Sequence, residues 1–302
     1  MESLKKRLKE KIITLETTPP KLPTLEPMIE KIEKSGVVDY IDGFSTTDCP
    51  LSKLKYNSII AAYRLQEKFK KPVIATMSMR DRNKIALQSD LLGANDLGVT
   101  HILALTGDPA KMSDQPNTKG VVEGSSILLL EIIRAFNNGM DYAGKEFKIK
   151  PKPITPFAVS NSYARNFSTI EKKIFKKIKN YAAAIITQPV YDMEIVKKLL
   201  EIRNNVRDEF NDERKEAEII FGFFPITKLK TAQFLHSHVP GIYVPDKWIE
   251  KLIKAHKISE EEEFKVGMEL SVKLFKKLKQ IHPKIHIMTA NRFEVAKEIL
   301  TS

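Results

Sequence analysis

Eight short apolar runs, separated by longer amphipathic stretches, limit what this chain of 302 residues can fold into more than any other feature. Each run is rich in Ile, Val or Phe, and continuous apolar character indicates strands that are buried on both faces of a sheet. The stretches between them, such as YNSIIAAYRLQEKF at 56–69, have the pattern of amphipathic helices. Eight β–α repeats predict an α/β fold, a single-domain (β/α)8 TIM barrel that spans residues 1–302. The runs lie at residues 12–20, 38–48, 72–79, 101–109, 154–161, 182–192, 218–226 and 284–292.

Two further features bear on this fold. A doubly wound open sheet would share the alternation of strands and helices, but the G-x-G-x-x-G turn that it normally uses after its first strand is missing. The segment GMDYAGKEFKIKPKP at 139–153 is long for a connection between a helix and a strand. It predicts a small hairpin or a partner-binding flap before the fifth strand.

Polar and turn-forming residues follow the apolar runs. In a parallel barrel the carboxyl ends of all strands meet at one face, where such enzymes have their active sites. Any one of these residues is a common helix cap, but the convergence of acids, a glutamine and an arginine on one face predicts a functional site. These residues are Glu16, Thr17, Thr18, Ser45, Thr46, Thr47, Asp48, Ser78, Thr106, Gly107, Asp108, Ser160, Asn161, Thr187, Gln188, Thr289, Asn291 and Arg292.

The net charge of +12 raises the question of a nucleic-acid partner. A nucleic-acid footprint is clustered and interleaved with aromatic residues, whereas the lysines here recur along helix faces, as in EKKIFKKIKN at 171–180. We therefore expect no nucleic-acid partner. Solvated helix surfaces explain most of the charge, and a site for polyanionic small molecules, such as dinucleotides or polyglutamate tails, is the alternative.

Other classes of site and location are disfavoured. The single cysteine, Cys49, has no partner for an internal disulfide, and no apolar run approaches the roughly 18 residues of a membrane helix. The N-terminus lacks the apolar block of a signal peptide, so we expect a cytoplasmic protein without membrane contact. The histidines of HSH at 236–238 lack a nearby third ligand, so no metal site is expected.

Six collinear motifs give the chain a recognisable identity. They are LETTPPK at 15–21, RDRNKIALQSDLLGANDLG at 80–98, LALTGDP at 103–109, IITQPVYD at 185–192, GFFPITKLKTAQFL at 222–235 and TANR at 289–292. In this order they resemble the methylenetetrahydrofolate reductase family, in its bacterial form with the catalytic barrel alone. Single motifs such as Gly-Asp-Pro are weak, but six in order cover almost the whole chain.

The resemblance implies a flavoenzyme of one-carbon metabolism. FAD would lie across the carboxyl face of the barrel, and 5,10-methylenetetrahydrofolate would be reduced to 5-methyltetrahydrofolate by hydride transfer from flavin N5. Glu16 matches the family acid that protonates the substrate for ring opening, and Asp108 matches the acid beside the pterin and the flavin. The alternatives are a salt-bridged carboxylate for Glu16 and a helix cap for Asp108.

Other positions follow from the same resemblance. The substrate contacts that it implies are Glu16, Asp108, Gln188, Thr231 and Arg292. The cofactor contacts are Ser45 or Thr46, with a register uncertain by one, and Thr76, Arg80, Arg82, Asn83, Thr106, Gly107, Asp108, Ser160, Asn161 and Lys177. For Lys177 and Arg80 a solvated surface position is the alternative.

Three positions depart from the family pattern. Thr76 stands where several members have a histidine near the flavin, Leu235 where some have a phenylalanine that stacks on the ligand, and Thr231 where some have a glutamine. These changes bear on the electron donor, which we expect to be NAD(P)H, reduced ferredoxin or a partner subunit. A homo-oligomer or a hetero-complex is expected, and a flavin- and folate-binding subunit that needs a partner is the alternative function.

Overall fold

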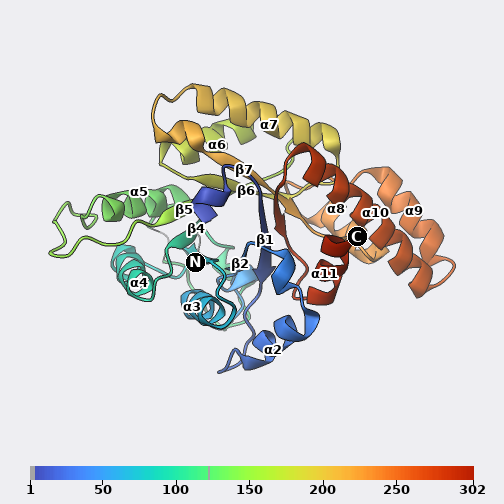
Figure 1. Ribbon diagram of the computed structural model, residues 1–302, viewed down its shortest axis with the longest axis horizontal. Helices are drawn as coiled ribbons and strands as arrows, with labels where there is room; N and C mark the ends of the chain where they lie inside the picture. Colours follow the sequence, from blue (N-terminus) through green and yellow to red (C-terminus); the bar gives the residue numbers. More distant parts are fainter. Residues whose placement is uncertain (1–3, 122) are drawn as a thin grey trace.

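The computed structural model describes residues 4–121 and 123–302, and its eight strands close into a parallel barrel in chain order (Figure 1). Strand β1 pairs with β2 on one side and with β8 on the other, which closes the ring. The predicted (β/α)8 barrel is confirmed, and the open doubly wound sheet is excluded. The strands are β1 (Ile12–Thr17), β2 (Gly43–Thr46), β3 (Val73–Ser78), β4 (His101–Leu105), β5 (Thr155–Ser160), β6 (Ala184–Pro189), β7 (Glu218–Phe223) and β8 (Lys284–Ile287).

The helices form a ring around the strands (Figure 1). Three of them, α8, α9 and α10, occupy the connection between β7 and β8, and α1 precedes the first strand. The helices are α1 (Leu4–Arg7), α2 (Glu26–Ser35), α3 (Ser58–Phe69), α4 (Lys84–Asp96), α5 (Ser126–Asn137), α6 (Ser168–Lys179), α7 (Met193–Asp208), α8 (Leu229–His238), α9 (Asp246–His256), α10 (Glu260–Ile281) and α11 (Phe293–Thr301). None of the helices in the described part of the chain is long and apolar enough to cross a membrane.

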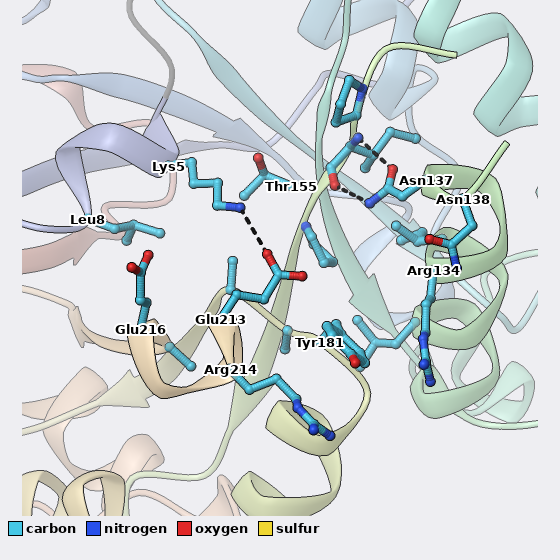
Figure 2. A pocket seen from close by; sticks show the side chains of 18 of the residues that line it. Lys5, Leu8, Arg134, Asn137, Asn138, Thr155, Tyr181, Glu213, Arg214 and Glu216 are labelled. Atoms are coloured by element: carbon cyan, nitrogen blue, oxygen red, sulfur yellow. Dashed lines mark hydrogen bonds and ion pairs between the residues drawn. The ribbon is translucent and has the colours of Figure 1, made fainter. Parts of the chain in front are cut away.

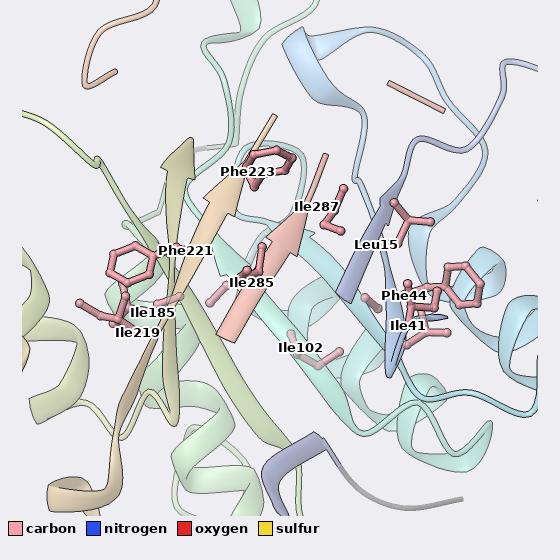
Figure 3. Close-up of a cluster of buried hydrophobic side chains, with 14 of the residues drawn as sticks. Leu15, Ile41, Phe44, Ile102, Ile185, Ile219, Phe221, Phe223, Ile285 and Ile287 are labelled. Carbon is pink, nitrogen blue, oxygen red and sulfur yellow. The ribbon is translucent and has the colours of Figure 1, made fainter. Parts of the chain in front are cut away.

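The apolar side chains form two layers, because successive residues of a strand point to opposite faces. The outer layer packs between the sheet and the helices and includes Phe44, Phe221 and Ile285 (Figure 3). The inner layer fills the amino-terminal half of the barrel with Leu4, Leu8, Ile12, Ile74, Leu103, Phe157, Ala184, Ile186 and Ile220. Leu4 and Leu8 come from the segment before β1, so this segment seals the amino-terminal end and leaves the carboxyl end for polar groups.

The strands end where the sequence changes from apolar to polar. The run at 101–109 is strand only as far as Leu105, and Gly107 then turns the chain with a φ of +91°. A Cβ at this position would lie 2.9 Å from the Cβ of Arg80, so both the conformation and the packing require glycine.

The excursion at 139–153 lies between α5 and β5, on the amino-terminal side of the barrel. An antiparallel bridge joins Met140 to Glu146, and Gly144 turns the chain between them with a φ of +82°. The amide of Tyr142 donates to the side-chain oxygen of Gln88 on α4 (2.8 Å). The segment is therefore a short hairpin against α4, on the side of the barrel away from the carboxyl ends of the strands.

Candidate active site

Buried hydroxyl groups without a hydrogen-bond partner gather at the carboxyl end of the barrel. Among the described residues, the side-chain oxygens of Thr47, Ser78, Ser160 and Thr289 have no partner. They follow or end β2, β3, β5 and β8. Because a buried polar group without a partner costs about 1–3 kcal/mol, this end of the barrel has hydrogen-bonding capacity that a ligand can use.

A row of three polar side chains crosses the seam between the first and the last strand. Thr14 and His286 are direct neighbours in the β1–β8 pairing, and the Thr14 hydroxyl lies 2.7 Å from His286 Nδ1. The other ring nitrogen, Nε2, lies 3.8 Å from Oε2 of Glu16. Thr14 and His286 are buried, whereas the Glu16 side chain is 27% exposed and therefore reaches the open end of the barrel.

The contact between Thr14 and His286 allows an assignment of the hydrogen on the imidazole ring. The Thr14 hydroxyl has no other hydrogen-bond partner among the described residues, so we assign it as the donor to Nδ1. The ring hydrogen is then on Nε2 and faces the Glu16 carboxylate. In this tautomer His286 directs an N–H group toward Glu16, at a distance of 3.8 Å that is longer than a hydrogen bond.

Asp108 joins two loops at the same face. Its Oδ2 accepts from the amide of Leu51 (2.6 Å), and the Ser52 hydroxyl donates to the carbonyl of Asp108 (3.2 Å). Leu51, Ser52 and Cys49 all have positive φ values, of 57°, 58° and 43°, which are unfavourable for side chains other than glycine. Such strain persists where the surroundings hold it, and the carboxylate of Asp108 is one of the groups that hold it. Asp108 is not the cap of α5, because Ser125 fills that position.

Gln188 lies at the end of β6 and contacts the loop between α8 and α9. With its amide nitrogen toward this loop, it donates to the carbonyls of Pro240 and Gly241 (both 3.1 Å). Gly241 has a φ of +89°, and a Cβ there would lie 2.5 Å from Cγ of Asn161. The residue must therefore be glycine for the loop to approach Gln188 and Asn161.

The structure also shows which hydroxyl groups point into the mouth of the barrel, which is its open end at the carboxyl ends of the strands. Ser45 is the pairing partner of Glu16, whereas the Thr46 hydroxyl donates to the carbonyl of Ser58 on α3, outside the barrel. Ser45 is therefore the residue of the two whose side chain faces the barrel interior. Thr76, on the same face as Ser78 of β3, is 4% exposed, and the Thr106 hydroxyl accepts from the amide of Ser126 at the start of α5.

The charged residues after β3 have partners within the chain. Nε of Arg80 donates to Asp81 (2.8 Å), and Arg82 forms ion pairs with Asp48 (2.6 Å) and Asp90 (2.7 Å). The side chain of Asn83 caps α4 by accepting from the amide of Ala86 (2.9 Å). The expected flavin contacts of Arg80, Arg82 and Asn83 stay predictions beside these structural roles.

Two further cations that the sequence predicts as ligand contacts have hydrogen-bond partners within the chain. Lys177 donates through Nζ to the carbonyl of Val159, and burial lowers the pKa of Lys177 to about 8, with a smaller contribution from Lys173. Arg292 donates to the Thr227 hydroxyl (2.9 Å), and burial lowers its pKa. The ligand contacts expected of these two residues stay predictions.

Helix α8 carries the positions where the chain departs from the family pattern. Thr231 lies in its first turn, and Leu235 is partly buried against the hydrophobic core. Phe234, one residue earlier, is 55% exposed and stacks on the ring of His238 (5.6 Å between ring centres). An aromatic ring is therefore available on this helix, but one position before the expected one.

Sequence reasoning did not single out Thr14 or His286 as site residues, whereas Asn291 is among the polar residues that it placed at the carboxyl face. The alternation along β8 places His286 on the inner face, and the same alternation places Thr14 beside Glu16, so the signal was present. Asn291 binds both main-chain groups of Thr18, accepting from its amide (2.9 Å) and donating to its carbonyl (2.7 Å). It ties the loop after β8 to the loop after β1.

A cavity of about 420 Å³ lies at the opposite, amino-terminal end of the barrel (Figure 2). It is lined by residues that precede β5, β6 and β7, and an ion pair between Lys5 and Glu213 (3.7 Å) crosses it. Because barrel enzymes carry their chemistry at the carboxyl ends of the strands, we assign no reaction to this cavity.

Comparison with solved structures supports the fold. A protein from Clostridium thermocellum, described as uncharacterized and as binding two copies of 5-methyl-5,6,7,8-tetrahydrofolic acid, is similar at 18% identity with a TM-score of 0.64, over 99% of each chain. DmoA from Hyphomicrobium sulfonivorans is similar at 8% identity with a TM-score of 0.55, over 97% of this chain and 87% of its own. At these identities the likeness shows the fold alone.

Comparison of sequences gives the family. No curated protein matches the chain. The sequence profile of methylenetetrahydrofolate reductase matches residues 2–302, which is nearly the whole chain. The chain therefore belongs to the methylenetetrahydrofolate reductase family.

Proposed function

We propose that the chain catalyses the FAD-dependent reduction of 5,10-methylenetetrahydrofolate to 5-methyltetrahydrofolate, with Glu16 as the proton donor. Membership of the family makes the chain a folate-related reductase. The observation that carries the finer proposal is the row of Thr14, His286 and Glu16, which ends in a partly exposed carboxyl group at the mouth of the barrel.

The residues at the mouth fit a planar cofactor with polar edges. The partnerless hydroxyls of Thr47 and Ser78, which continue the inner faces of β2 and β3, can bond the heteroatoms of an isoalloxazine or a pterin ring. Ser45 would add a further hydroxyl, and Lys177 would meet a phosphate. FAD, when bound, supplies the hydride at N5.

The chain's own residues supply the proton and the orientation. The methylene bridge of the substrate reacts only after its five-membered ring opens, and the opening needs a proton on N10. Glu16 would deliver that proton, with the imidazole of His286 beside its carboxyl group at 3.8 Å. Asp108 would contact the pterin, and its bond to the Leu51 amide fixes the carboxylate at the mouth.

Binding of a reduced folate by a relative with the same fold supports the substrate class. The protein from Clostridium thermocellum binds 5-methyltetrahydrofolic acid, the product in this proposal, and aligns with the present chain over its full length. The single cysteine suits a reducing compartment, and we therefore place the reaction in the cytoplasm.

An anaerobic titration tests the proposal. The purified protein should carry or take up FAD, and its flavin absorbance should bleach with one of NADH, NADPH or reduced ferredoxin. Addition of 5,10-methylenetetrahydrofolate should then restore the oxidised spectrum. A protein that takes up no FAD, or a reduced flavin that the folate does not reoxidise, would refute it.

A second candidate is a flavin- and folate-binding subunit that receives electrons from a partner protein. The observation that favours it is Leu235, which is packed against the core where some relatives present a stacking ring. In that case the flavin would stay oxidised with both nicotinamide nucleotides and would be reduced when the partner subunit is added.

A further inference from the structure

The cavity at the amino-terminal end of the barrel has the size of a small-molecule site. Its volume of about 420 Å³ falls within the range of ligand pockets in proteins, about 300–1,000 Å³. It lies on the side of the barrel away from the strand ends that carry the candidate active site, so the two sites are separate (Figure 2). We call it the basal cavity. Its lining residues lie within 5–9, 130–138, 153–156, 181–183 and 213–217.

One part of the wall of the basal cavity is apolar. Pro153, Ala183 and the ring of Tyr181 line it and are at least partly exposed. The buried side chains of Leu130 and Ile133 complete this part of the wall. Because removal of apolar area from water is favourable, this surface favours a ligand with an aliphatic or aromatic group.

The ring of Tyr181 is held in place. The guanidinium groups of Arg134 and Arg214 lie over it, at 4.4 and 4.9 Å from the centre of the ring. The φ of Tyr181 is 64°, which is unfavourable for a bulky side chain and persists only where the surroundings hold it. The apolar wall is therefore formed before any ligand arrives.

A hydroxyl group without a partner lies in the wall as well. Thr155, the first residue of β5, is 8% exposed, and its side chain forms no hydrogen bond with the described part of the chain (Figure 2). A hydroxyl group that is shielded from water in this way gains from a hydrogen bond with a ligand. The cavity therefore has a polar contact to offer beside its apolar surface.

Two ion pairs lie across the cavity from this wall. Nζ of Lys5 lies 3.7 Å from Oε2 of Glu213, and Nζ of Lys9 lies 3.2 Å from Oε2 of Glu216. The separation of Lys5 and Glu213 exceeds the roughly 2.7–3.2 Å of an N–H···O hydrogen bond. The basal cavity thus presents a cation and an anion side by side, without a direct hydrogen bond between these two atoms.

This pair of charges selects a ligand that carries both signs. A simple anion is attracted by Lys5 but repelled by Glu213, and a simple cation meets the reverse. A zwitterion satisfies both residues, because its carboxylate can accept from Lys5 while its ammonium group donates to Glu213. In an α-amino acid the two charged groups are attached to the same carbon atom, which suits partners that lie side by side.

We propose that the basal cavity binds an α-amino acid with an apolar side chain. The carboxylate pairs with Lys5 and accepts from the Thr155 hydroxyl, and the ammonium group pairs with Glu213. The side chain of the ligand packs on the wall at Tyr181 and Pro153. This site does not depend on the reaction proposed for the mouth of the barrel.

Isothermal titration calorimetry with the full chain tests the proposal. The probes are L-leucine, L-methionine and L-phenylalanine, each raised to about 10 mM, which detects dissociation constants in the millimolar range. We expect at least one of them to bind. Analogues of that amino acid that lack the ammonium group or the carboxylate should bind at least about tenfold more weakly, because a charge-assisted hydrogen bond supplies about that factor. For leucine these analogues are 4-methylpentanoate and 3-methylbutylamine.

Two variants locate the bound amino acid. Glu213→Gln should weaken binding at least about tenfold, because it removes the partner of the ammonium group. Thr155→Val keeps the shape of the side chain and should weaken binding about threefold through the loss of one neutral hydrogen bond. The matched control is Glu194→Gln, which removes an exposed partner of Lys197 (2.7 Å) on α7 and should leave the affinity unchanged. The urea midpoint of each variant shows whether it is folded.

The outcomes either support or overturn the proposal. Absence of binding by all three amino acids overturns it, and so does equal binding by an analogue that lacks one of the charges. An affinity that Glu213→Gln leaves intact places the ligand elsewhere and also overturns it. Binding that needs both charges, is weakened in Glu213→Gln and is retained in Glu194→Gln supports it. The anaerobic flavin titration is a separate measurement, so failure here is distinguishable from failure of the proposed function.

Discussion

Glu16 and His286 meet although 270 positions of sequence separate them, because β1 and β8 are neighbours in the closed barrel. The carboxyl group of Glu16 is partly exposed to solvent and lies beside the buried imidazole of His286. This combination suits a group that must deliver a proton to a bound ligand and be recharged from solvent.

The first prediction concerns Glu16 itself. Glu16→Gln should leave reduction of the flavin by its donor unchanged, because that half-reaction needs no proton from this residue. Reoxidation by 5,10-methylenetetrahydrofolate should slow by about 10²- to 10⁴-fold, the usual contribution of a positioned acid. Stopped-flow absorbance of each half-reaction measures both rates, and an equal loss in the two would show that Glu16 has another role.

The second prediction concerns His286. His286→Leu removes the donor that faces Glu16, and it should slow the folate half-reaction by about tenfold, which corresponds to 1.4 kcal/mol. His286→Gln retains an amide donor and should lose less. The pH profile of the folate half-reaction should change in the leucine variant, while that of flavin reduction should stay as in the native protein; a purely structural role would leave both profiles unaltered.

The third prediction concerns Asp108, whose carboxylate holds the loop at Leu51 and to which we assign a ligand contact as well. Asp108→Asn keeps an oxygen for the Leu51 amide and should preserve the loop, yet it should weaken folate binding and shift the flavin potential because the negative charge is lost. Asp108→Ala should in addition increase proteolytic cleavage near residues 49–52. Unchanged folate affinity in the asparagine variant would reduce Asp108 to a support for the loop.

At the scale of single elements, the strands were predictable from the sequence and the loop contacts were not. A continuous apolar run identifies β4 and its end at the Thr106–Gly107 turn, because a strand that is buried on both faces has apolar residues at successive positions. Gln188 shows the limit: its motif places it at a strand end, but its bond to Gly241 depends on a loop 53 positions away. Alternation settles Ser45 against Thr46 only once the pairing of β2 with β1 is known.

The ion pair between Asp48 and Arg82 fixes the loop after β2 against the loop after β3. Both side chains are largely buried, with 6% and 12% exposure, and Asp48 also accepts from the amide of Ser78 (2.9 Å). Asp48→Asn should therefore lower the free energy of unfolding by about 3 kcal/mol, because it leaves a buried guanidinium with a weaker partner. Urea denaturation measures this, and Glu67→Gln, which removes an exposed partner of Lys70, should cost less than about 1 kcal/mol.

At the scale of the whole molecule, two buried histidines make the fold sensitive to acid. Burial lowers the pKa of both His101 and His282 to about 4. In His282 the hydrogen bond to the Ile219 carbonyl acts in the opposite direction, but burial has the larger effect on the pKa. Both lie near the amino-terminal ends of strands, away from the mouth. The ordinary pKa of histidine is 6.5. Between pH 6.5 and about pH 4 these two histidines are therefore protonated in the unfolded chain and neutral in the folded chain.

The stability of the protein should consequently fall as the pH drops from about 6.5 to 4 and become less dependent on these groups below that. His282→Gln can keep a donor for the Ile219 carbonyl but does not titrate. The difference between the urea midpoints at pH 7.5 and at pH 4.5 should therefore be smaller in this variant than in the native protein. An identical difference in the two proteins would exclude His282 as a source of the acid sensitivity.

The seam between β1 and β8 has a consequence for biosynthesis. Glu16 is synthesised early. His286, which lies beside it, and Asn291, which binds Thr18 in its loop, are synthesised only with β8 and the loop that follows. Every partial translation product consequently lacks the assembled acid, however much of the ring has formed. In the proposed reaction Glu16 therefore becomes competent only when β8 pairs with β1.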